Sequence, residues 1–561
     1  MTAKWPLLAK ALAPLKQASA SLWNSWTAAV LLIALLTMLP VLVVLSSVFT
    51  NSSDVWAHLA ETVLTRYILN SLGLMLGVGS GVLLLGVGTA WLVSMCRFPG
   101  SRILEWALLL PLAAPAYLLA YTYTDFLEYF GPVQTTLRSL FGWEGVADYW
   151  FPNLRSLGGA IALFSLTLYP YVYMLSRVTF LEQSSCTLEA SRALGCTPWR
   201  SFFTVALPLA RPAIAAGTAL ALMETLNDFG TVQYFGVSTF TTGIYRTWLS
   251  LGDRTAAAQL AAVLMLFILV LILLERWSRR QARYYQTANR FQSLTAYDLR
   301  GWRALLALAA CSLPIGLGLL LPGGLLLHMT VTHADQTLDS NFWPLTYHSL
   351  LLALITAGVV SVLSLILAYG VRLQNSPPMR FGVRVAAMGY AIPGSVIAVG
   401  ILLPVTRLDR AIATGLQPLG ISVGLLISGT IAALVFAYSV RFLAVSLSAV
   451  ESGLAKIRPS LDDASRSLGY TPTRTLAQVH APLLSGSLLT AVMLVFVDVM
   501  KELPATLVMR PFNFDTLAVQ VYQYASDERL IEAAAPALMI LLVGLLPVVL
   551  LSWQIAKARQ G

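Results

Sequence analysis

Four carboxylates stand inside otherwise apolar stretches of the chain, and they occur as two pairs. Glu224 and Asp228 lie in METLNDFGTVQYFG, and Asp498 and Glu502 lie in VDVMKELPAT, at the corresponding place in the second half of the chain. Within each pair the second acid follows one helical turn after the first, which predicts both carboxylates on one face of a helix. Carboxylate oxygens suit hard cations, so the pairs indicate a negatively charged path for a cation rather than for an anion such as sulfate. The alternative is a structural polar network in which Lys501 neutralises a neighbouring acid.

The other reactive residue types form no recognisable centre. The four cysteines show no Cys-x-x-Cys pair, and the five histidines show no ligand spacing on one element. None of the six lysines follows a glycine, whereas a P-loop requires Gly-Lys-Ser/Thr. No Ser-His-Asp or Cys-His nucleophile can be argued. We therefore expect no enzymatic activity, no bound cofactor and no resident metal, with Glu224 and Asp228 as transient ligands at most.

The composition indicates what must position these acids. The chain has 561 residues, of which 57% are hydrophobic and 11% are charged, as is typical of membrane proteins. A membrane span needs roughly 20 predominantly apolar residues. Twelve stretches qualify, so we expect an all-α integral membrane protein with twelve transmembrane helices. They are residues 27–49, 69–95, 103–126, 157–180, 212–232, 255–275, 304–328, 347–373, 382–405, 421–442, 485–509 and 531–553.

The distribution of Lys and Arg predicts the orientation. The run 27–49 is longer than the apolar part of a signal peptide, so we expect it to be a retained first span. Basic residues concentrate in every second connection, above all in Glu275–Trp302, which places both termini in the cytoplasm by the positive-inside rule. The net charge of +10 is then largely a matter of topology, and no nucleic-acid partner is needed to explain it.

The chain contains an internal repeat. ASRALGCTPWR (residues 190–200) and ASRSLGYTPTR (residues 464–474) match at eight of eleven positions, and Pro115 and Pro393 hold equivalent places in the two halves. Six spans per repeat is an even number, so the two halves have the same orientation and the repeats are parallel. The predicted domains are a first half (1–275), a basic cytoplasmic linker (276–303) and a second half (304–561).

The repeated stretch describes two short helices joined by a tight turn. A glycine, Gly195 or Gly469, ends the first helix, because glycine best adopts the left-handed conformation there. A Thr-Pro pair begins the second helix as N-cap and first helical residue. A further proline, Pro208 or Pro482, is predicted to end it before the next span. A rigid knob presented twice on the cytoplasmic side indicates a two-lobed cytoplasmic partner.

This stretch resembles the signature loop of permease subunits of bacterial ABC importers. Their pattern is Glu-Ala-Ala, three residues, Gly, nine residues, Ile, one residue and Leu-Pro. The first copy matches it with Glu189, Ala190, Ser191, Gly195, Val205, Leu207 and Pro208. The second matches it with Asp463, Ala464, Ser465, Gly469, Val479, Ala481 and Pro482. The departures are Ser for the second Ala, Val for Ile, Asp463 for Glu and Ala481 for Leu, and the last makes the second copy weaker.

The resemblance implies two coupling loops, residues 182–211 and 452–484, each docking on an ATP-hydrolysing subunit. Two loops in one chain imply two copies of that subunit, with ATP used by the partners, and one fused chain in place of a permease dimer. The acid and the Arg three residues later can also pair locally and stabilise an exposed helix. The implied location is the lipid bilayer of the bacterial inner (plasma) membrane.

The stretches around the acids resemble ferric-iron importer permeases. These are METLNDFGTVQYFG, STFTTGIYRTW and KELPATLVMRPFNFDTLAVQVYQYASDERL, and with the loops the resemblance covers most of the chain. It implies a periplasmic or lipid-anchored binding protein that delivers Fe(III), with Phe240–Arg254 and Phe512–Arg529 as candidate contacts or as ordinary packed loops. Thiamine permeases share the fused architecture and are the nearest alternative. A secondary transporter with Glu224 and Asp228 as proton sites is the alternative of another class.

Overall fold

The computed structural model describes residues 25–50, 53–182, 191, 194–280, 297–419 and 426–558. Within these ranges the chain is almost entirely helical, and its only strands are β1 (Cys96–Arg97) and β2 (Tyr297–Asp298). The two strands pair in parallel, so the end of the predicted linker is hydrogen-bonded to the connection after the second span. The expected all-α class is confirmed.

Nine helices in the described ranges are long and apolar enough to cross a membrane, and three bent pairs bring the candidate spans to twelve. The nine are Ser25–Ser47, Leu64–Met95, Leu157–Leu181, Trp199–Asn227, Arg254–Ser278, Trp302–Thr332, Phe342–Leu373, Ile431–Leu454 and Leu530–Leu550. The bent pairs are Ser101–Ala113 with Ala116–Phe141, Pro377–Ala391 with Gly394–Leu416, and Pro472–Leu483 with Ser485–Met500. Each candidate overlaps one of the twelve predicted spans, in the same order.

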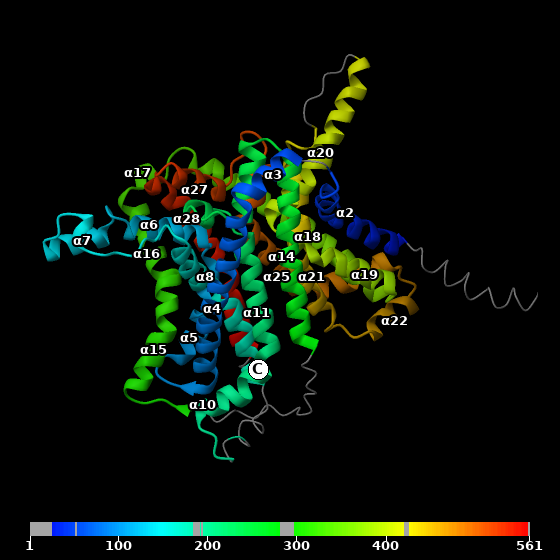
Figure 1. Cartoon of the computed structure of the whole chain (residues 1–561). Helices are drawn as coiled ribbons and strands as arrows, with labels where there is room; N and C mark the ends of the chain where they lie inside the picture. The colour runs from blue at the N-terminus through cyan, green and yellow to red at the C-terminus, as the bar shows by residue number, and fades with distance from the viewer. Residues whose placement is uncertain are drawn as a thin grey trace, which may run out of the picture. The chain divides into compact units, whose positions relative to one another are not determined.

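Figure 1 labels most of the helices along the chain. Before the linker they are α2 (Ser25–Ser47), α3 (Ser53–Thr62), α4 (Leu64–Met95), α5 (Ser101–Ala107), α6 (Ala116–Leu127), α7 (Pro132–Phe141), α8 (Leu157–Glu182), α10 (Pro198–Ser201), α11 (Leu207–Asn227), α12 (Gly230–Tyr234), α13 (Phe240–Tyr245) and α14 (Arg254–Arg280). After it come α15 (Trp302–Ile315), α16 (Leu321–Thr332), α17 (Ala334–Thr337), α18 (Phe342–Leu373), α19 (Pro377–Ala386), α20 (Gly394–Leu416), α21 (Ile431–Leu454), α22 (Ser460–Ser467), α23 (Pro472–Thr475), α24 (Ala481–Leu483), α25 (Ser485–Met500), α26 (Pro504–Met509), α27 (Leu517–Ser526) and α28 (Leu530–Ala558). Short 3₁₀ segments are Leu110–Ala113, Val146–Asp148, Ala387–Ala391 and Gln417–Leu419, and π-helical turns are Phe202–Ala206, Arg246–Ser250, Gly316–Leu320 and Leu476–His480.

Two prolines break the third and ninth spans. The third span bends by 90° at Pro115 and the ninth by 114° at Pro393. The prolines have nearly the same conformation, with φ −58° and ψ 140° at Pro115 and φ −57° and ψ 142° at Pro393. Proline lacks the N–H of a helix interior and disfavours helical geometry in the residue before it, so both spans divide at that residue. The internal repeat therefore extends to the backbone conformation.

The predicted helix end at Pro208 is wrong, because the helix continues through this proline. The π turn Phe202–Ala206 precedes it, with the Leu207 N–H bonded to the Phe202 carbonyl, and α11 then continues to Asn227. A π turn shifts the hydrogen-bond pattern by one residue, which accommodates the missing N–H of the proline. The equivalent turn Leu476–His480 precedes Pro482, and there the helix bends by 79° before α25.

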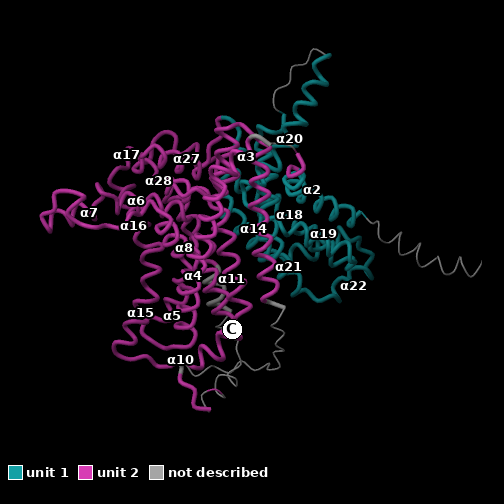
Figure 2. The backbone as a smooth tube through the Cα atoms, in the orientation of Figure 1, with its two compact units in different colours: residues 1–46, 350–499, 509–512 teal, residues 47–349, 500–508, 513–561 magenta. Residues whose placement is uncertain are grey.

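The chain forms two compact units that do not coincide with the two sequence halves. Unit 1 contains residues 1–46, 350–499 and 509–512, and unit 2 contains residues 47–349, 500–508 and 513–561 (Figure 2). The predicted boundaries 1–275 and 304–561 thus describe the repeat in the sequence, whereas the two packed units contain other combinations of spans. The first span belongs to unit 1, together with spans from the second half.

In unit 1, α2 packs on α18, α19 and α20. The hydroxyl of Thr27 donates to the Gln374 side-chain carbonyl at 3.0 Å, and the Trp26 and Tyr369 rings meet edge to face at 5.4 Å. A Cβ placed on Gly400 would lie 2.4 Å from the Pro40 carbonyl oxygen, so the two helix backbones touch there. Small residues allow such close approach between membrane helices.

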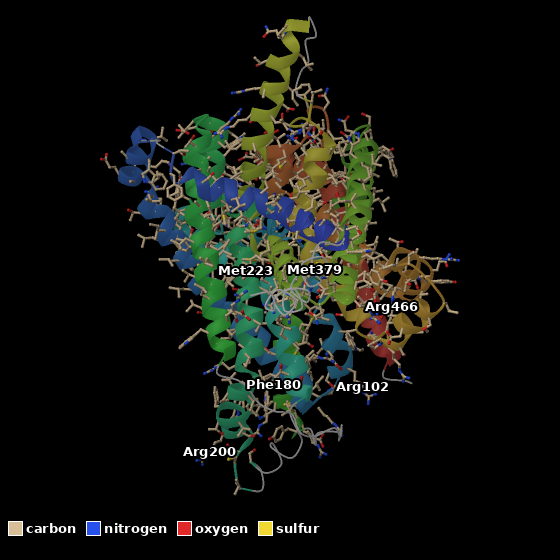
Figure 3. All side chains as sticks on the ribbon, turned by 90° about the vertical axis from the view of Figure 1, so that its right-hand side faces the viewer. Arg102, Phe180, Arg200, Met223, Met379 and Arg466 are labelled. Atoms are coloured by element: carbon tan, nitrogen blue, oxygen red, sulfur yellow. The ribbon has the colours of Figure 1, made fainter. Side chains whose placement is uncertain are left out.

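Unit 2 is built around α4, α8 and α11, which lie side by side (Figure 1). Cβ atoms added to Gly86 of α4 or Gly217 of α11 would each come within 2.7 Å of Val172 of α8, so these glycines are required for the close packing. The seventh span joins the same unit, where the Tyr123 hydroxyl donates to the Leu317 carbonyl at 2.6 Å. In Figure 3, Arg102, Phe180 and Arg200 lie toward one end of unit 2, and Met223 lies farther from that end.

Candidate functional site

The second of the repeated stretches has the predicted turn. Helix α22 ends before Gly469, whose φ is +78°, and the Tyr470 N–H donates to the Ser465 carbonyl at 3.0 Å. This is the hydrogen bond of a helix that terminates at a left-handed glycine. The Thr471 hydroxyl then accepts the Arg474 N–H at 3.4 Å and caps α23.

The first copy has the same geometry where it is described. Gly195 has φ +81°, and the Cys196 N–H donates to the Ser191 carbonyl at 3.0 Å. The Thr197 hydroxyl accepts the Arg200 N–H at 3.3 Å, as Thr471 does in the other copy. The turn predicted at both glycines is therefore confirmed. The candidate coupling residues Glu189 and Ala190 lie outside the described residues.

Both turns expose apolar side chains at equivalent positions. Leu194 is 85% exposed, and Leu468, its counterpart in the second copy, is 75% exposed. Trp199 of the first copy is 70% exposed as well. An exposed leucine directly before each left-handed glycine is suited to insertion into an apolar groove of another protein.

The acidic residue of the second copy faces solvent. The Asp463 carboxylate lies 3.8 Å from Arg466, and the two side chains are 76% and 62% exposed. The predicted local pair is present, but at such exposure it contributes only a few tenths of a kcal/mol. Ala464 is exposed beside it, and Pro482 follows the π turn in α24. These residues are accessible to a partner.

A network of three charged or polar side chains holds the second stretch against its own unit. The Asp462 carboxylate accepts a hydrogen bond from Arg372 Nε at 2.8 Å and lies 2.6 Å from His480 Nε2. The remaining guanidinium N–H groups of Arg372 donate to the carbonyls of Leu454 (2.7 Å) and Ile457 (3.0 Å). His480 is fully buried. The network thus links α18, α21, α22 and the π turn before Pro482.

The first copy is held differently. The hydroxyls of Ser191 and Ser201, both buried, lie 2.8 Å apart, and Ala206 takes the place that His480 has in the second copy. The network of Arg372, Asp462 and His480 was not predicted from the sequence. Arg372 lies in a different span, far from Asp462 along the chain, so no spacing could reveal the contact. His480, the one histidine of the predicted coupling loop 452–484, was nevertheless a signal of a polar contact.

Two of the four predicted path acids cap short helices. The Asp228 carboxylate accepts the N–H groups of Thr231 (2.9 Å) and Val232 (3.2 Å) at the start of α12. The Glu502 carboxylate, 4% exposed, accepts the N–H groups of Ala505 (3.0 Å) and Thr506 (3.1 Å) in α26. Both acids therefore stand at breaks of the fifth and eleventh spans, at repeat-equivalent positions.

The shared helix face predicted for each acidic pair is not formed. Helix α11 ends at Asn227 and α25 ends at Met500, so Asp228 and Glu502 lie beyond the helices that carry Glu224 and Asp498. The reason is the capping chemistry, since each carboxylate turns to the next helix rather than along its own. Glu224 and Asp498 are partly buried in α11 and α25.

The outer segments predicted as contacts of a binding protein are partly interior. All six residues of α13, Phe240–Tyr245, are buried, whereas Leu249 and Leu251 are 62% and 56% exposed. In the other segment Phe512 is 93% exposed, and Leu517–Val519 at the start of α27 are buried. In the part of the chain that the structure describes, no three His, Cys, Asp or Glu residues gather as a metal site.

Comparison with known proteins relates these features to one family. Residues 82–284, which include the first repeat stretch and Asp228, match the family of binding-protein-dependent transport system inner membrane components. The Escherichia coli molybdenum transport system permease protein ModB is 30% identical over 205 residues, which cover 35% of this chain and 86% of that protein. This chain belongs to that family.

Two relatives align with nearly the whole permease. The Haemophilus influenzae Fe(3+)-transport system permease protein FbpB 2 is 25% identical over 486 residues, covering 86% of this permease and 88% of that protein. The putative ferric transport system permease protein FbpB 1 of the same organism is 23% identical over 519 residues, covering 88% and 78%. Both alignments are too long to lie within one half, in agreement with a fused permease of two repeats.

Proposed function

We propose that this permease carries ferric iron inward across the bacterial inner membrane, driven by ATP that partner subunits hydrolyse. The assignment of ferric iron as the substrate rests on the similarity along 86% of the chain to a relative named for Fe(3+) transport. The alignment with ModB covers only 35% of the chain. Carboxylates at the breaks of the fifth and eleventh spans, Asp228 and Glu502, also suit a cation better than an oxyanion.

Two turns of the same backbone conformation support two partner ATPase subunits, one on each loop. The turns at Gly195 and Gly469 have the same conformation, and each presents an exposed leucine. We place both turns and both termini in the cytoplasm, where ATP is available, and a substrate-binding protein at the opposite face. The family description itself refers to transport that depends on a binding protein.

The continuous helix after Gly195 supports the proposal that movement of the turn is transmitted into the fifth span. The chain from Trp199 to Asn227 is one candidate span, so a displacement of the turn moves a rigid element that ends at Asp228. In alternating access, the ATPase subunits would bias two arrangements of such elements. The second stretch reaches its span through a 79° bend, and there the Arg372–Asp462–His480 network fixes the turn to α18.

The substrate is tested by transport in a reconstituted system. The permease, its ATPase subunits and its binding protein are placed in proteoliposomes, and ATP-dependent uptake of labelled Fe(III), molybdate and thiamine is measured. We expect Fe(III) uptake alone. Uptake of molybdate or thiamine without Fe(III) would assign the other substrate, and uptake without ATPase subunits would identify a gradient-driven carrier.

A further inference from the structure

A cluster of tyrosines surrounds the break of the fifth span in unit 2. Tyr117 and Tyr121 come from α6, with ring centroids 5.8 Å apart, and the Tyr121 ring lies 4.6 Å from that of Tyr234 in α12. The Tyr522 ring of α27 lies 5.6 Å from the ring of Phe229, the residue after Asp228. We refer to Tyr117, Tyr121, Tyr234 and Tyr522 as the tyrosine cluster. Its members come from three elements that meet where spans are discontinuous.

The acids at the span breaks lie beside this cluster. Asp228 stands two residues before Gly230 and Glu502 directly follows Lys501, and both Gly230 and Lys501 contact Tyr117. The Tyr117 hydroxyl donates to the Lys501 carbonyl at 3.4 Å, next to Glu502. The Gly230 backbone packs so closely on Tyr117 that an added Cβ would lie 2.8 Å from its Cβ. Phenol and carboxyl oxygens from both repeats are thus concentrated in one region.

The hydroxyl of Tyr121 has no hydrogen-bond partner within the described part of the chain. The residue is 3% exposed, and the oxygen itself is buried. Tyr121 also lines a cavity of about 10 Å³ together with Thr122, Asp125 and Val521, which is room for about one water-sized sphere. A phenylalanine in its place would pack the same ring and would bring no buried polar group. Ring packing therefore accounts for the aromatic group at this position but not for its oxygen.

We propose that the tyrosine cluster, with Asp228 and Glu502, is a transient Fe(III) site on the translocation path. The inference rests on the proposed function and names the chemistry of its path. Phenolate and carboxylate oxygens are hard donors that suit a small, highly charged cation.

Charges around the cluster are compatible with a cation. Arg155 lies over the Tyr234 ring at 4.9 Å, but its charge is paired with Glu128 at 2.5 Å. Asp125 adds a further carboxylate at the cavity beside Tyr121. In a membrane interior, ionisable groups are costly and usually serve an ion pathway or a paired partner. The aromatic rings also exclude water and fix the positions of their oxygens.

The test removes single hydroxyl oxygen atoms from tyrosines in the intact importer. Tyr121→Phe removes the unpartnered hydroxyl and keeps the ring, and Tyr169→Phe is the matched control. Tyr169 of α8 also has a buried hydroxyl without a hydrogen-bond partner among the described residues, and it does not belong to the tyrosine cluster. We expect Tyr121→Phe to lower the initial rate of labelled Fe(III) uptake at least tenfold, with ATPase activity retained and with Tyr169→Phe unchanged. Equal uptake by Tyr121→Phe and wild type would overturn the proposal.

The variant Asp228→Asn distinguishes a role of Asp228 as an iron ligand from its role as a helix cap. Asparagine caps a helix about as well as aspartate but brings no negative charge. We expect Asp228→Asn to lose Fe(III) uptake while its thermal stability stays at the wild-type value; wild-type uptake by this variant would contradict a ligand role.

A spectroscopic measurement reports binding directly. The complete importer, trapped with vanadate and titrated with Fe(III), should show a visible phenolate-to-iron charge-transfer band that Tyr121→Phe weakens and Tyr169→Phe leaves unchanged. A wild-type importer that transports no iron refutes the proposed function. A wild type that transports iron without this band, or with a band insensitive to Tyr121→Phe, refutes the site alone.

Discussion

Replacing Arg372 by Met should release the second coupling loop from unit 1. Arg372 donates hydrogen bonds to Asp462 and to the carbonyls of Leu454 and Ile457, and the Arg372 and Asp462 side chains are only 15% and 12% exposed. Removing one partner of a buried ion pair costs about 3–5 kcal/mol, because the other charge is left uncompensated. His480 still contacts Asp462, so we take the lower end, about 3 kcal/mol, which is about two powers of ten in a local opening equilibrium.

The assay is amide hydrogen exchange of residues 460–480 in the purified permease, followed by ATP-dependent uptake with the partner subunits. We expect Arg372→Met to raise the exchange rate of this segment about 100-fold and to lower coupled uptake, without changing exchange in α4 or α8. Arg466→Ala is the control, since its pair with Asp463 is exposed and contributes little. Exchange at the wild-type rate in Arg372→Met, or an equal effect of Arg466→Ala, would refute the reasoning.

Three further predictions concern the turn, a thiol and the helix packing. Gly469→Val should uncouple ATP hydrolysis from uptake while the spans stay inserted, because the left-handed conformation at φ +78° costs a residue with a side chain about 1–2 kcal/mol; coupled uptake at the wild-type level would exclude a role of this turn. Burial raises the pKa of the Cys96 thiol to about 11, so peptide mapping should find maleimide on the partly exposed Cys196 and none on Cys96 at neutral pH. Bound ATPase subunits should protect Cys196, and labelling unaffected by them would place their contact elsewhere. Gly86→Ala should lower the unfolding temperature through about 1–3 kcal/mol of overpacking against α8, whereas Gly88→Ala, which meets no atom within 4 Å, should not; equal unfolding temperatures would contradict the packing argument.

The spans and the turns could be predicted because local chemistry specifies them. Long apolar runs identify membrane helices in any context, and a glycine followed by Thr-Pro determines the turn at Gly195 and Gly469 through backbone preferences alone. The bends at Pro115 and Pro393 occur at residues that the sequence already singled out. Their angles depend on packing, which the sequence pattern does not contain.

The break of the fifth span was not predicted, because a long apolar run in the sequence hides the end of one helix and the start of the next. The run 212–232 looks continuous because its average hydropathy is high, but Asp228 is followed shortly by Thr231, whose N–H it caps. An acid before Gly and Thr was a visible start signal for α12, and it was outweighed by the length of the run. For Phe240–Arg254 the sequence leaves a contact surface and an ordinary packed loop open, and the burial of all six residues of α13 depends on tertiary packing. The contact of Arg372 with Asp462 depends on tertiary structure alone.

The placement of α2 in unit 1 sets an order of events during synthesis. Its Pro40 carbonyl packs on Gly400 of α20, which the ribosome adds only after seven further spans have been made. At about 5–20 residues per second, the first span waits on the order of a minute in the membrane before its packing surface exists. A gene divided at the linker would produce a first fragment whose leading helix has its binding surface on the other fragment. The two fragments would then be joined by that helix, and assembly of the permease would depend on their concentrations.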